Sequence, residues 1–152
     1  MSRDTRIFAL CLGALALLIL GASALATVAI AHGASPLLRI PFKLMCHGIP
    51  HRCLTISGTP MPICARCVAI YAGFIIGIAL FPLARRIEER VMRIVLAVSA
   101  LPIFLDGITQ AMGLRESTNP LRLATGLTVG AAFGLWALVA IETRARQRFA
   151  ES

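Results

Sequence analysis

Residues 7–31 read IFALCLGALALLILGASALATVAIA, a run of 25 residues that contains no charged side chain. An α-helix rises about 1.5 Å per residue, so about 20 residues cross the roughly 30 Å hydrocarbon core of a bilayer. Only helices and closed barrels satisfy their backbone hydrogen bonds in lipid, and this run lacks the strict alternation of a barrel strand. The run therefore predicts a transmembrane helix.

Three further apolar runs lie at residues 68–84, 94–113 and 123–141. The run at 68–84 is short, but residues that flank it at the membrane interface let such a helix span the bilayer. We therefore predict an all-α fold with a single membrane domain over residues 1–152. It is expected to be an integral membrane four-helix bundle with a long Cys/His-containing loop between the first and second helices.

The first run also has features of a cleaved signal peptide, because Arg3 and Arg6 precede it and small residues follow its apolar centre. The apolar part of a signal peptide normally has about 7–15 residues, which is much shorter than this run. We therefore expect the segment to remain as a membrane helix.

The composition excludes several classes of protein. Hydrophobic residues make up 58% of the chain, charged residues 14%, and the mean hydropathy is +0.83. A soluble domain has about 45–50% apolar and about 25% charged residues, so a soluble enzyme, a disordered tail and a coiled coil are excluded. The net charge of +8 comes mostly from residues that flank the apolar runs. This placement favours the lipid bilayer and its anionic headgroups as partners, and argues against nucleic acid.

The basic residues also predict an orientation. One side of the predicted bundle collects nine of them and the other side six, and the more positive side normally faces the cytoplasm. We therefore predict a multi-pass protein of the plasma membrane with both termini in the cytoplasm. The nine are Arg3, Arg6, Arg85, Arg86, Arg90, Arg93, Arg144, Arg146 and Arg148, and the six are Arg39, Lys43, Arg52, Arg66, Arg115 and Arg122.

The connection between the first two spans holds a cluster of cysteines and histidines. Its members are Cys46, His47, His51, Cys53, Cys64 and Cys67. Cys64 and Cys67 form a C-x-x-C pair near the start of the second helix, where free backbone N–H groups and Arg66 favour the thiolate form. A thiolate is what both a metal ion and a disulfide-exchange partner require. Cys11 lies alone in the first span and is expected to be a small buried residue.

Three interpretations of this cluster remain open from the residues alone. The first is a bound metal, with zinc as the default for mixed Cys/His ligands and with two cysteines and two histidines available to join the C-x-x-C pair. The second is a set of structural disulfides, because the loop is predicted to face an oxidising compartment. The third is reactive thiol chemistry at Cys64 and Cys67.

A second polar cluster is predicted on the same side of the membrane, at the end of the third span and the start of the fourth. It consists of Asp106, Gln110, Arg115, Asn119 and Arg122. A carboxylate at membrane depth normally faces the bundle interior with a partner, so Asp106 is expected either to pair with Arg122 or Arg115, or to act as a catalytic base or proton carrier. The arginines suit a lipid phosphate, so an anionic lipid or lipid-linked phosphate is a candidate partner.

The motifs together resemble a family of small prokaryotic membrane proteins that is known only as a domain of unknown function. The resemblance covers roughly residues 40–130 and rests on Cys46-His47, on residues 62–67 (PICARC) and on the Asp106-Gly107 to Thr125-Gly126 pattern. It implies a multi-span membrane protein with this Cys/His and Asp/Gln/Arg/Asn pattern, and it brings no activity. In that family a serine is commoner at the position of Cys53 and a glutamine at that of Gly48. The resemblance therefore implies Cys46, His47, Cys64 and Cys67 as the metal ligands, with Cys53 and His51 as alternates.

The predicted function is therefore that of an integral membrane protein with a zinc-like Cys/His metal site on its non-cytoplasmic face, beside an Asp/Arg polar pocket. One alternative is a membrane enzyme or carrier that acts on a lipid-linked phosphate, and another is a membrane thiol–disulfide protein. The sequence assigns no reaction and no oligomeric state, and it leaves open whether the chain is an enzyme.

Overall fold

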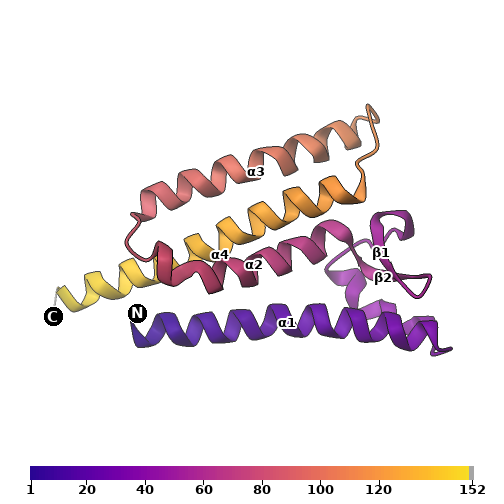
Figure 1. Ribbon diagram of the computed structural model, residues 1–152, viewed down its shortest axis with the longest axis horizontal. Helices are drawn as coiled ribbons and strands as arrows, with labels where there is room; N and C mark the ends of the chain where they lie inside the picture. The colour runs from indigo at the N-terminus through magenta and orange to yellow at the C-terminus, as the bar shows by residue number, and fades with distance from the viewer. Residues whose placement is uncertain (151–152) are drawn as a thin grey trace.

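Four long helices lie side by side in the order α1, α2, α4, α3 across the molecule (Figure 1). The computed structural model describes the backbone of residues 1–150 and the side chains of residues 1–148. All four helices are long and apolar enough to cross a membrane. Their bounds are Arg3–Ala31 for α1, Ala65–Ala84 for α2, Glu89–Ala111 for α3 and Asn119–Ala150 for α4.

The outer surfaces of these helices are apolar, as the lipid phase requires. Leu10, Leu18 and Leu25 of α1 are each about two-thirds exposed or more, and Phe104 and Leu105 on the outer face of α3 are each 60% exposed or more. Such surfaces are unfavourable in water and favourable in hydrocarbon. Cys11, which was expected to be buried, is exposed on α1, because that part of the helix faces outward. The predicted four-helix membrane fold is confirmed.

All four helices begin before the predicted spans, and α4 also ends later, because polar and charged residues continue the helices. The second helix begins at Ala65 and not at residue 68, so it includes Arg66, whose side chain is paired within the protein. The fourth helix continues from residue 141 to Ala150 through a charged segment. A prediction that ends each span at the first charged residue therefore gives helices that are too short.

The connection between α1 and α2 is folded and contains a β-hairpin that the sequence analysis did not predict. Two 3-10 helices, η1 (Pro36–Leu44) and η2 (Pro50–Arg52), precede the antiparallel strands β1 (Cys53–Ile56) and β2 (Thr59–Cys64). The strands are joined at Ser57 and Gly58, which both have positive φ, as in the tight turns that two-residue hairpins use. The prolines of β2 are tolerated because a two-stranded sheet has only edge strands.

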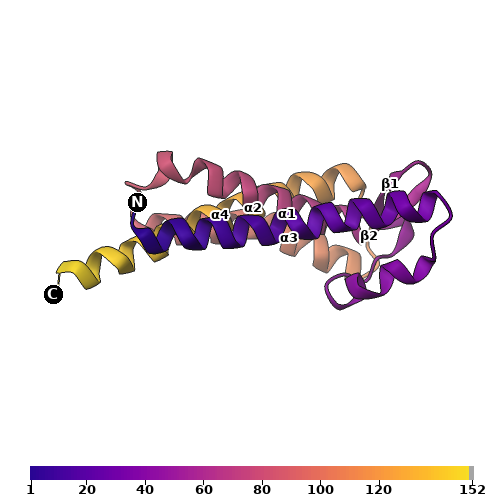
Figure 2. The same ribbon diagram turned by 90° about the horizontal axis from the view of Figure 1, so that it is seen from below.

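The hairpin packs against α1, and this contact places the cysteines. Met61 and Ile63 of β2 are buried together with Cys46, and Leu20 and Ala24 of α1 pack against them. Figure 2 shows the hairpin and the 3-10 segments at one end of the molecule, beside the C-terminal part of α1. The loop residue Cys46 is thereby held next to the point where β2 continues into α2.

Glycines let α2 and α4 approach each other closely. A Cβ atom at Gly130 of α4 would overlap the carbonyl oxygen of Ile70, and one at Gly73 of α2 would overlap the carbonyl oxygen of Leu127. Gly77, Gly126 and Gly134 continue the same contact. Small residues at this spacing are what backbone-to-backbone helix packing in membranes requires.

Substituting Gly130 with alanine is expected to lower the free energy of unfolding by about 2 kcal/mol, because the added methyl group must push two backbones apart. Gly107→Ala in α3 is the matched control, since a Cβ atom there has no neighbour within 4 Å. Unfolding of both variants in detergent micelles measures the difference. Equal stability of the two variants would contradict the close packing of α2 on α4.

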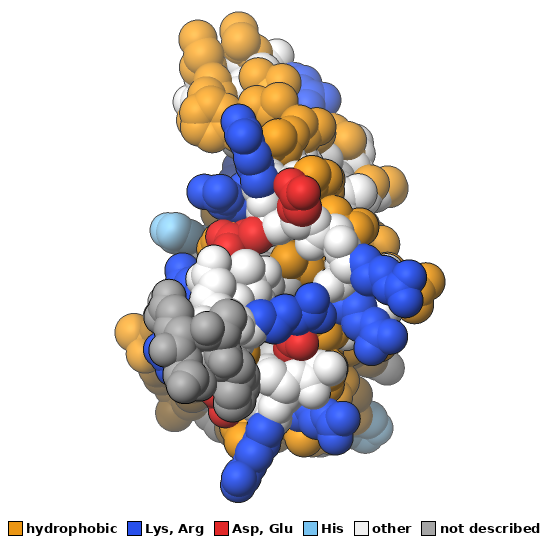
Figure 3. All heavy atoms as spheres, turned by 90° about the vertical axis from the view of Figure 1, so that its left-hand side faces the viewer, with side chains coloured by type: hydrophobic (Ala, Val, Ile, Leu, Met, Phe, Trp, Pro, Cys, Tyr) orange, Lys and Arg blue, Asp and Glu red, His pale blue; other side chains and the backbone are white. Residues whose placement is uncertain are grey.

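Both termini lie at the end of the molecule opposite the hairpin (Figure 1). Viewed from that end, arginine side chains surround the bundle, with a few carboxylates among them (Figure 3). The turn between α2 and α3 contributes Arg85 and Arg86, and α4 contributes Arg144 and Arg146. The molecule therefore has a strongly basic end and, at the opposite end of the helices, a cysteine-containing end.

Candidate metal centre and arginine-lined cavity

Three cysteine sulfurs meet where β2 continues into α2. The Sγ atoms of Cys46, Cys64 and Cys67 all lie within 4.8 Å of one another, and those of Cys64 and Cys67 are 3.5 Å apart. Thiolates bound tetrahedrally to zinc at about 2.3 Å stand about 3.8 Å from each other. Small side-chain movements are therefore enough to bring the three sulfurs onto one metal ion, so the group could hold one.

Local backbone geometry favours the thiolate form at this point. Cys64 is the N-cap residue of α2, so its sulfur lies near the positive end of the helix dipole. The hydrogen bond between the Cys64 and Cys67 sulfurs lowers the pKa of Cys64 to about 5. The backbone N–H of Cys64 donates to the Sγ of Cys46 at 3.2 Å. These contacts lower the cost of the negative charge that metal binding needs.

Gly48 allows the loop that carries Cys46 to approach β2. Its φ of +57° lies in the left-handed region, and a Cβ atom there would meet the carbonyl oxygen of Pro62 at 2.7 Å. A residue with a side chain would therefore be strained and would also displace the loop. In this chain Gly48 lets the loop pass close to Pro62, and the hairpin places Cys64 beside Cys46, which precedes it by 18 residues.

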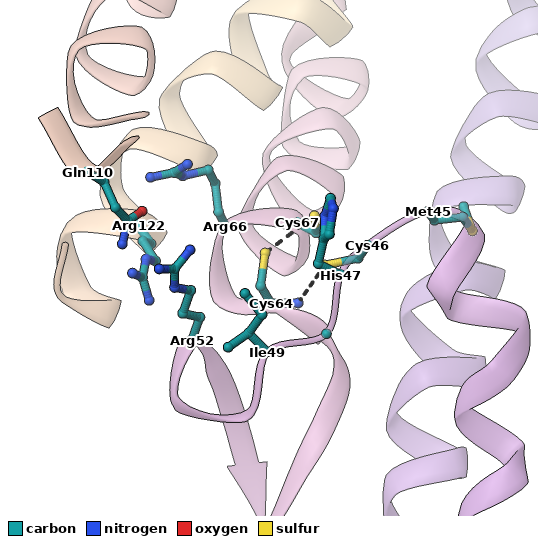
Figure 4. Close-up of a pocket in the computed structure, with 11 residues that line it drawn as sticks. Met45, Cys46, His47, Ile49, Arg52, Cys64, Arg66, Cys67, Gln110 and Arg122 are labelled. Atoms are coloured by element: carbon teal, nitrogen blue, oxygen red, sulfur yellow. Dashed lines mark hydrogen bonds between the residues drawn. The ribbon is translucent and has the colours of Figure 1, made fainter. Parts of the chain in front are cut away.

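The other predicted ligands lie near the three sulfurs but outside their group. His47 lines the same cavity as the cysteines (Figure 4). Cys53 is buried opposite Cys64 in the hairpin, and its thiol donates to the carbonyl oxygen of Ile49 at 3.1 Å. Burial raises the pKa of the Cys53 thiol to about 11, which makes it a poor ligand. His51 is exposed in η2, where its ring accepts from Arg52.

The three cysteines and a group of arginines share one cavity of about 400 Å³. Figure 4 shows the sulfurs on one side and the side chains of Arg52, Arg66 and Arg122 on the other, with Gln110 beside them. The residues come from the loop, from η2 and from three helices, α2, α3 and α4. Arg66 links the two sides, because it lies between Cys64 and Cys67 in the sequence and its side chain lies with the other arginines. The two polar clusters of the sequence analysis are therefore neighbours.

Asp106 ties this cavity to the third helix. Its carboxylate is 2% exposed and forms ion pairs with the guanidinium groups of Arg66 and Arg115, the latter at 2.8 Å between Oδ1 and Nη2. The side chain of Arg115 is half exposed, whereas that of Arg66 is mostly buried. Asp106 therefore fixes the arginine that stands between Cys64 and Cys67.

The structure places the rest of the predicted polar pocket around this ion-pair network. Arg122 is 3% exposed and donates to Asn119 Oδ1 at 3.2 Å; it forms no ion pair with Asp106 among the described residues. Asn119 donates in turn to the carbonyl oxygen of Cys53 at 3.5 Å. Gln110 and Arg122 line the cavity, whereas Asp106, Arg115 and Asn119 are not among its lining residues.

Sequence reasoning missed Arg52 as a lining residue and Arg66 as the partner of Asp106. Arg52 reaches the cavity only because η2 and β1 turn the loop back toward α4. The signal for Arg66 was present in the sequence, since an arginine in the first turn of a membrane helix needs a partner and Asp106 needs one as well.

Comparisons with known proteins identify relatives by sequence. The model of a family described as "Predicted membrane protein (DUF2085)" matches residues 46–136. An uncharacterised protein of Methanocaldococcus jannaschii is 37% identical over 91 residues, which cover 59% of this chain and 58% of that protein. An uncharacterised protein of Methanothermobacter thermautotrophicus is 37% identical over 92 residues, which cover 59% of this chain and 80% of the relative. No solved structure matches the chain.

The matched region begins at Cys46 and takes in the cysteine group, the arginines of the cavity and Asp106. It leaves out all of α1 and the last part of α4. The matched region spans a little over half of the Methanocaldococcus protein. Both relatives are archaeal and neither has a described activity.

Proposed function

This chain belongs to the DUF2085 family of predicted membrane proteins, and from that premise we propose that it holds a metal ion at its cysteine-containing end. Cys46, Cys64 and Cys67 would bind the ion, and zinc is the metal that this ligand set suits best. His47 lines the same cavity and is the candidate fourth ligand.

The third sulfur is the observation that carries this proposal. A dithiol that exchanges disulfides needs two cysteines, and Cys64 with Cys67 would be enough for it. A hairpin and a glycine with positive φ bring Cys46 to within 4.8 Å of both. A set of three sulfurs with a histidine nearby matches a Cys3His metal site better than a redox pair.

The remaining parts of the proposal concern orientation. We place both termini in the cytoplasm, because the end that holds them carries nine of the fifteen basic residues. Of the six at the opposite end, Arg66 and Arg115 are paired with Asp106 within the protein and contribute less to the orientation signal. The metal centre would then face the non-cytoplasmic side of the plasma membrane.

Thiol labelling tests the metal centre. In a Cys11→Ser, Cys53→Ser background three of the five cysteines remain, namely Cys46, Cys64 and Cys67. Under reducing conditions we expect N-ethylmaleimide to modify none of them before a chelator is added and all three afterwards, as counted by intact-protein mass spectrometry. The physical reason is that a metal-bound thiolate is held by its ion and is unavailable as a nucleophile.

The alternatives give different labelling patterns. A Cys64–Cys67 disulfide would leave one reactive thiol without reductant, and would release two more with reductant and not with chelator. Labelling that is unaffected by chelator would contradict the metal centre. The same experiment on intact cells with a membrane-impermeant maleimide reports the side, and chelator-dependent labelling from outside is expected.

A further inference from the structure

The cavity that the cysteines line has a second, basic wall. Arg52 of η2, Arg66 of α2 and Arg122 of α4 all line it, and their side chains converge in Figure 4. These residues come from three separate elements, so the convergence is a product of the fold and not of local sequence. Among the side chains that the structure describes, no acidic one lines the cavity.

The carboxylates of the protein balance the positive charges of this wall only in part. Asp106 pairs with Arg66, but it also pairs with Arg115, so one carboxylate serves two guanidinium groups. Arg52 and Arg122 have no ion-pair partner in the part of the chain that the structure describes. Arg122 is 3% exposed and its hydrogen bond goes to the neutral amide of Asn119. A buried charge is stable only when it is paired, so an acceptor from outside the chain is needed.

Two further donors in the same place lack acceptors. The Nε of Arg66 and the amide nitrogen of Gln110 are buried without a hydrogen-bond partner, and both residues line the cavity. Buried donors in proteins nearly always have a partner, so such a pair in one cavity marks a missing acceptor. An anion with several acceptor oxygens would satisfy these two donors and the unpaired arginines together.

We propose that this arginine wall binds a phosphate monoester or inorganic phosphate. A phosphate monoester carries about −1.5 to −2 charge at neutral pH, which matches the two unpaired arginines. Its oxygens accept the forked hydrogen bonds that guanidinium groups donate. The cavity of about 400 Å³ also leaves room for a substituent on the phosphate. The anion site uses residues other than the metal ligands and goes beyond the proposed metal function.

Phosphate titration of the purified protein in a non-ionic detergent tests the site. Arg52→Gln is expected to weaken the binding of inorganic phosphate about 10- to 100-fold, since it removes charge-assisted hydrogen bonds. Arg86→Gln removes the same charge from the exposed turn between α2 and α3 and is expected to leave the affinity within about twofold. Arg122→Lys keeps the charge but loses the fork, and an intermediate loss is expected.

Two results would overturn the proposal: no binding of phosphate by the wild-type chain, or equal weakening in Arg52→Gln and Arg86→Gln. A short-chain phosphatidic acid, with short-chain phosphatidylcholine as the control lipid, distinguishes the sources of the phosphate. Tighter binding of phosphatidic acid than of inorganic phosphate assigns the site to a lipid headgroup, and equal affinity assigns it to the free anion. Metal content measured on the same samples separates the two proposals. Metal-free protein that binds phosphate would contradict the metal centre and support the phosphate site.

Discussion

Replacing Cys64 with serine is expected to lower the affinity of the protein for zinc by at least about 100-fold, because changes to groups that merely orient a ligand already cost about 10- to 100-fold. Cys64 provides one of three sulfurs within 4.8 Å of one another, and it is the residue whose thiolate the start of α2 favours. A serine hydroxyl at this place is a much weaker ligand for zinc than a thiolate. Competition with a chelating indicator dye measures the affinity.

The folded state should lose stability in parallel. A metal ion that binds only the folded chain stabilises it by about 2.7 kcal/mol when present at 100 times its dissociation constant. Added zinc is therefore expected to raise the unfolding temperature of the wild-type chain and to have little effect on Cys64→Ser. Both experiments use the full chain in the same detergent.

Two other cysteines are matched controls for this substitution. Cys11→Ser changes an exposed residue of α1, and Cys53→Ser changes a buried thiol whose hydrogen bond to Ile49 a hydroxyl can also make. Neither is expected to change zinc affinity by more than about twofold, since neither sulfur belongs to the group of three. A loss in Cys53→Ser as large as that in Cys64→Ser would contradict the ligand assignment.

Replacing Asp106 with asparagine is expected to lower the free energy of unfolding by about 3 kcal/mol, the cost typical of removing one partner from a buried ion pair. The substitution keeps the shape of the side chain and removes the charge that Arg66 and Arg115 share. Most of the loss should come from Arg66, because Arg115 is half exposed and water can replace its partner. Reversible unfolding in mixed micelles measures the change.

Glu89→Gln is the control for this prediction. It removes the carboxylate that pairs with Arg93 one helical turn later. The distance between Glu89 Oε1 and Arg93 Nε is 3.9 Å, and the pair is open to solvent on the Arg93 side. The expected loss is below about 0.5 kcal/mol, since exposed ion pairs of this kind contribute little. If Asp106→Asn were no more destabilising than Glu89→Gln, the buried network would not hold α3 against the start of α2.

The four membrane helices could be predicted from the sequence because lipid leaves the backbone few alternatives. A run such as residues 7–31, apolar and free of charge, must form a helix or a barrel strand, and its length excludes the strand. The sequence also carries a local signal for close helix packing, since Gly126, Gly130 and Gly134 recur at the spacing of one helix face, but it does not name the partner helix. These are local properties of short segments.

The hairpin could not be predicted with the same rules. Pro60 and Pro62 argue against a strand in a larger sheet, and only the two-stranded form makes their missing N–H groups harmless. The Ser57-Gly58 turn was the one local signal for it. As a result the long connection was expected to be a loop, although it is the segment that places Cys46.

The composition of the candidate site was partly predictable, and its pairing was not. The C-x-x-C spacing indicates Cys64 and Cys67 as site residues, and the position of Asp106 within an apolar run indicates Asp106. The choice of partner for Asp106 depends on how α3 lies relative to α2, which no local pattern encodes. The pairing of Arg66 with Asp106 follows from that arrangement, and Arg52 became a site residue only through the folded connection.

Metal analysis of the wild-type protein tests the central claim most directly. The chain should be purified in detergent under reducing conditions without chelator, and its metal content quantified per polypeptide by elemental analysis. We expect about one equivalent of zinc or a similar ion per chain, bound by the three thiolates. Protein that contains no stoichiometric metal, even after incubation with zinc and removal of the excess, would contradict the account.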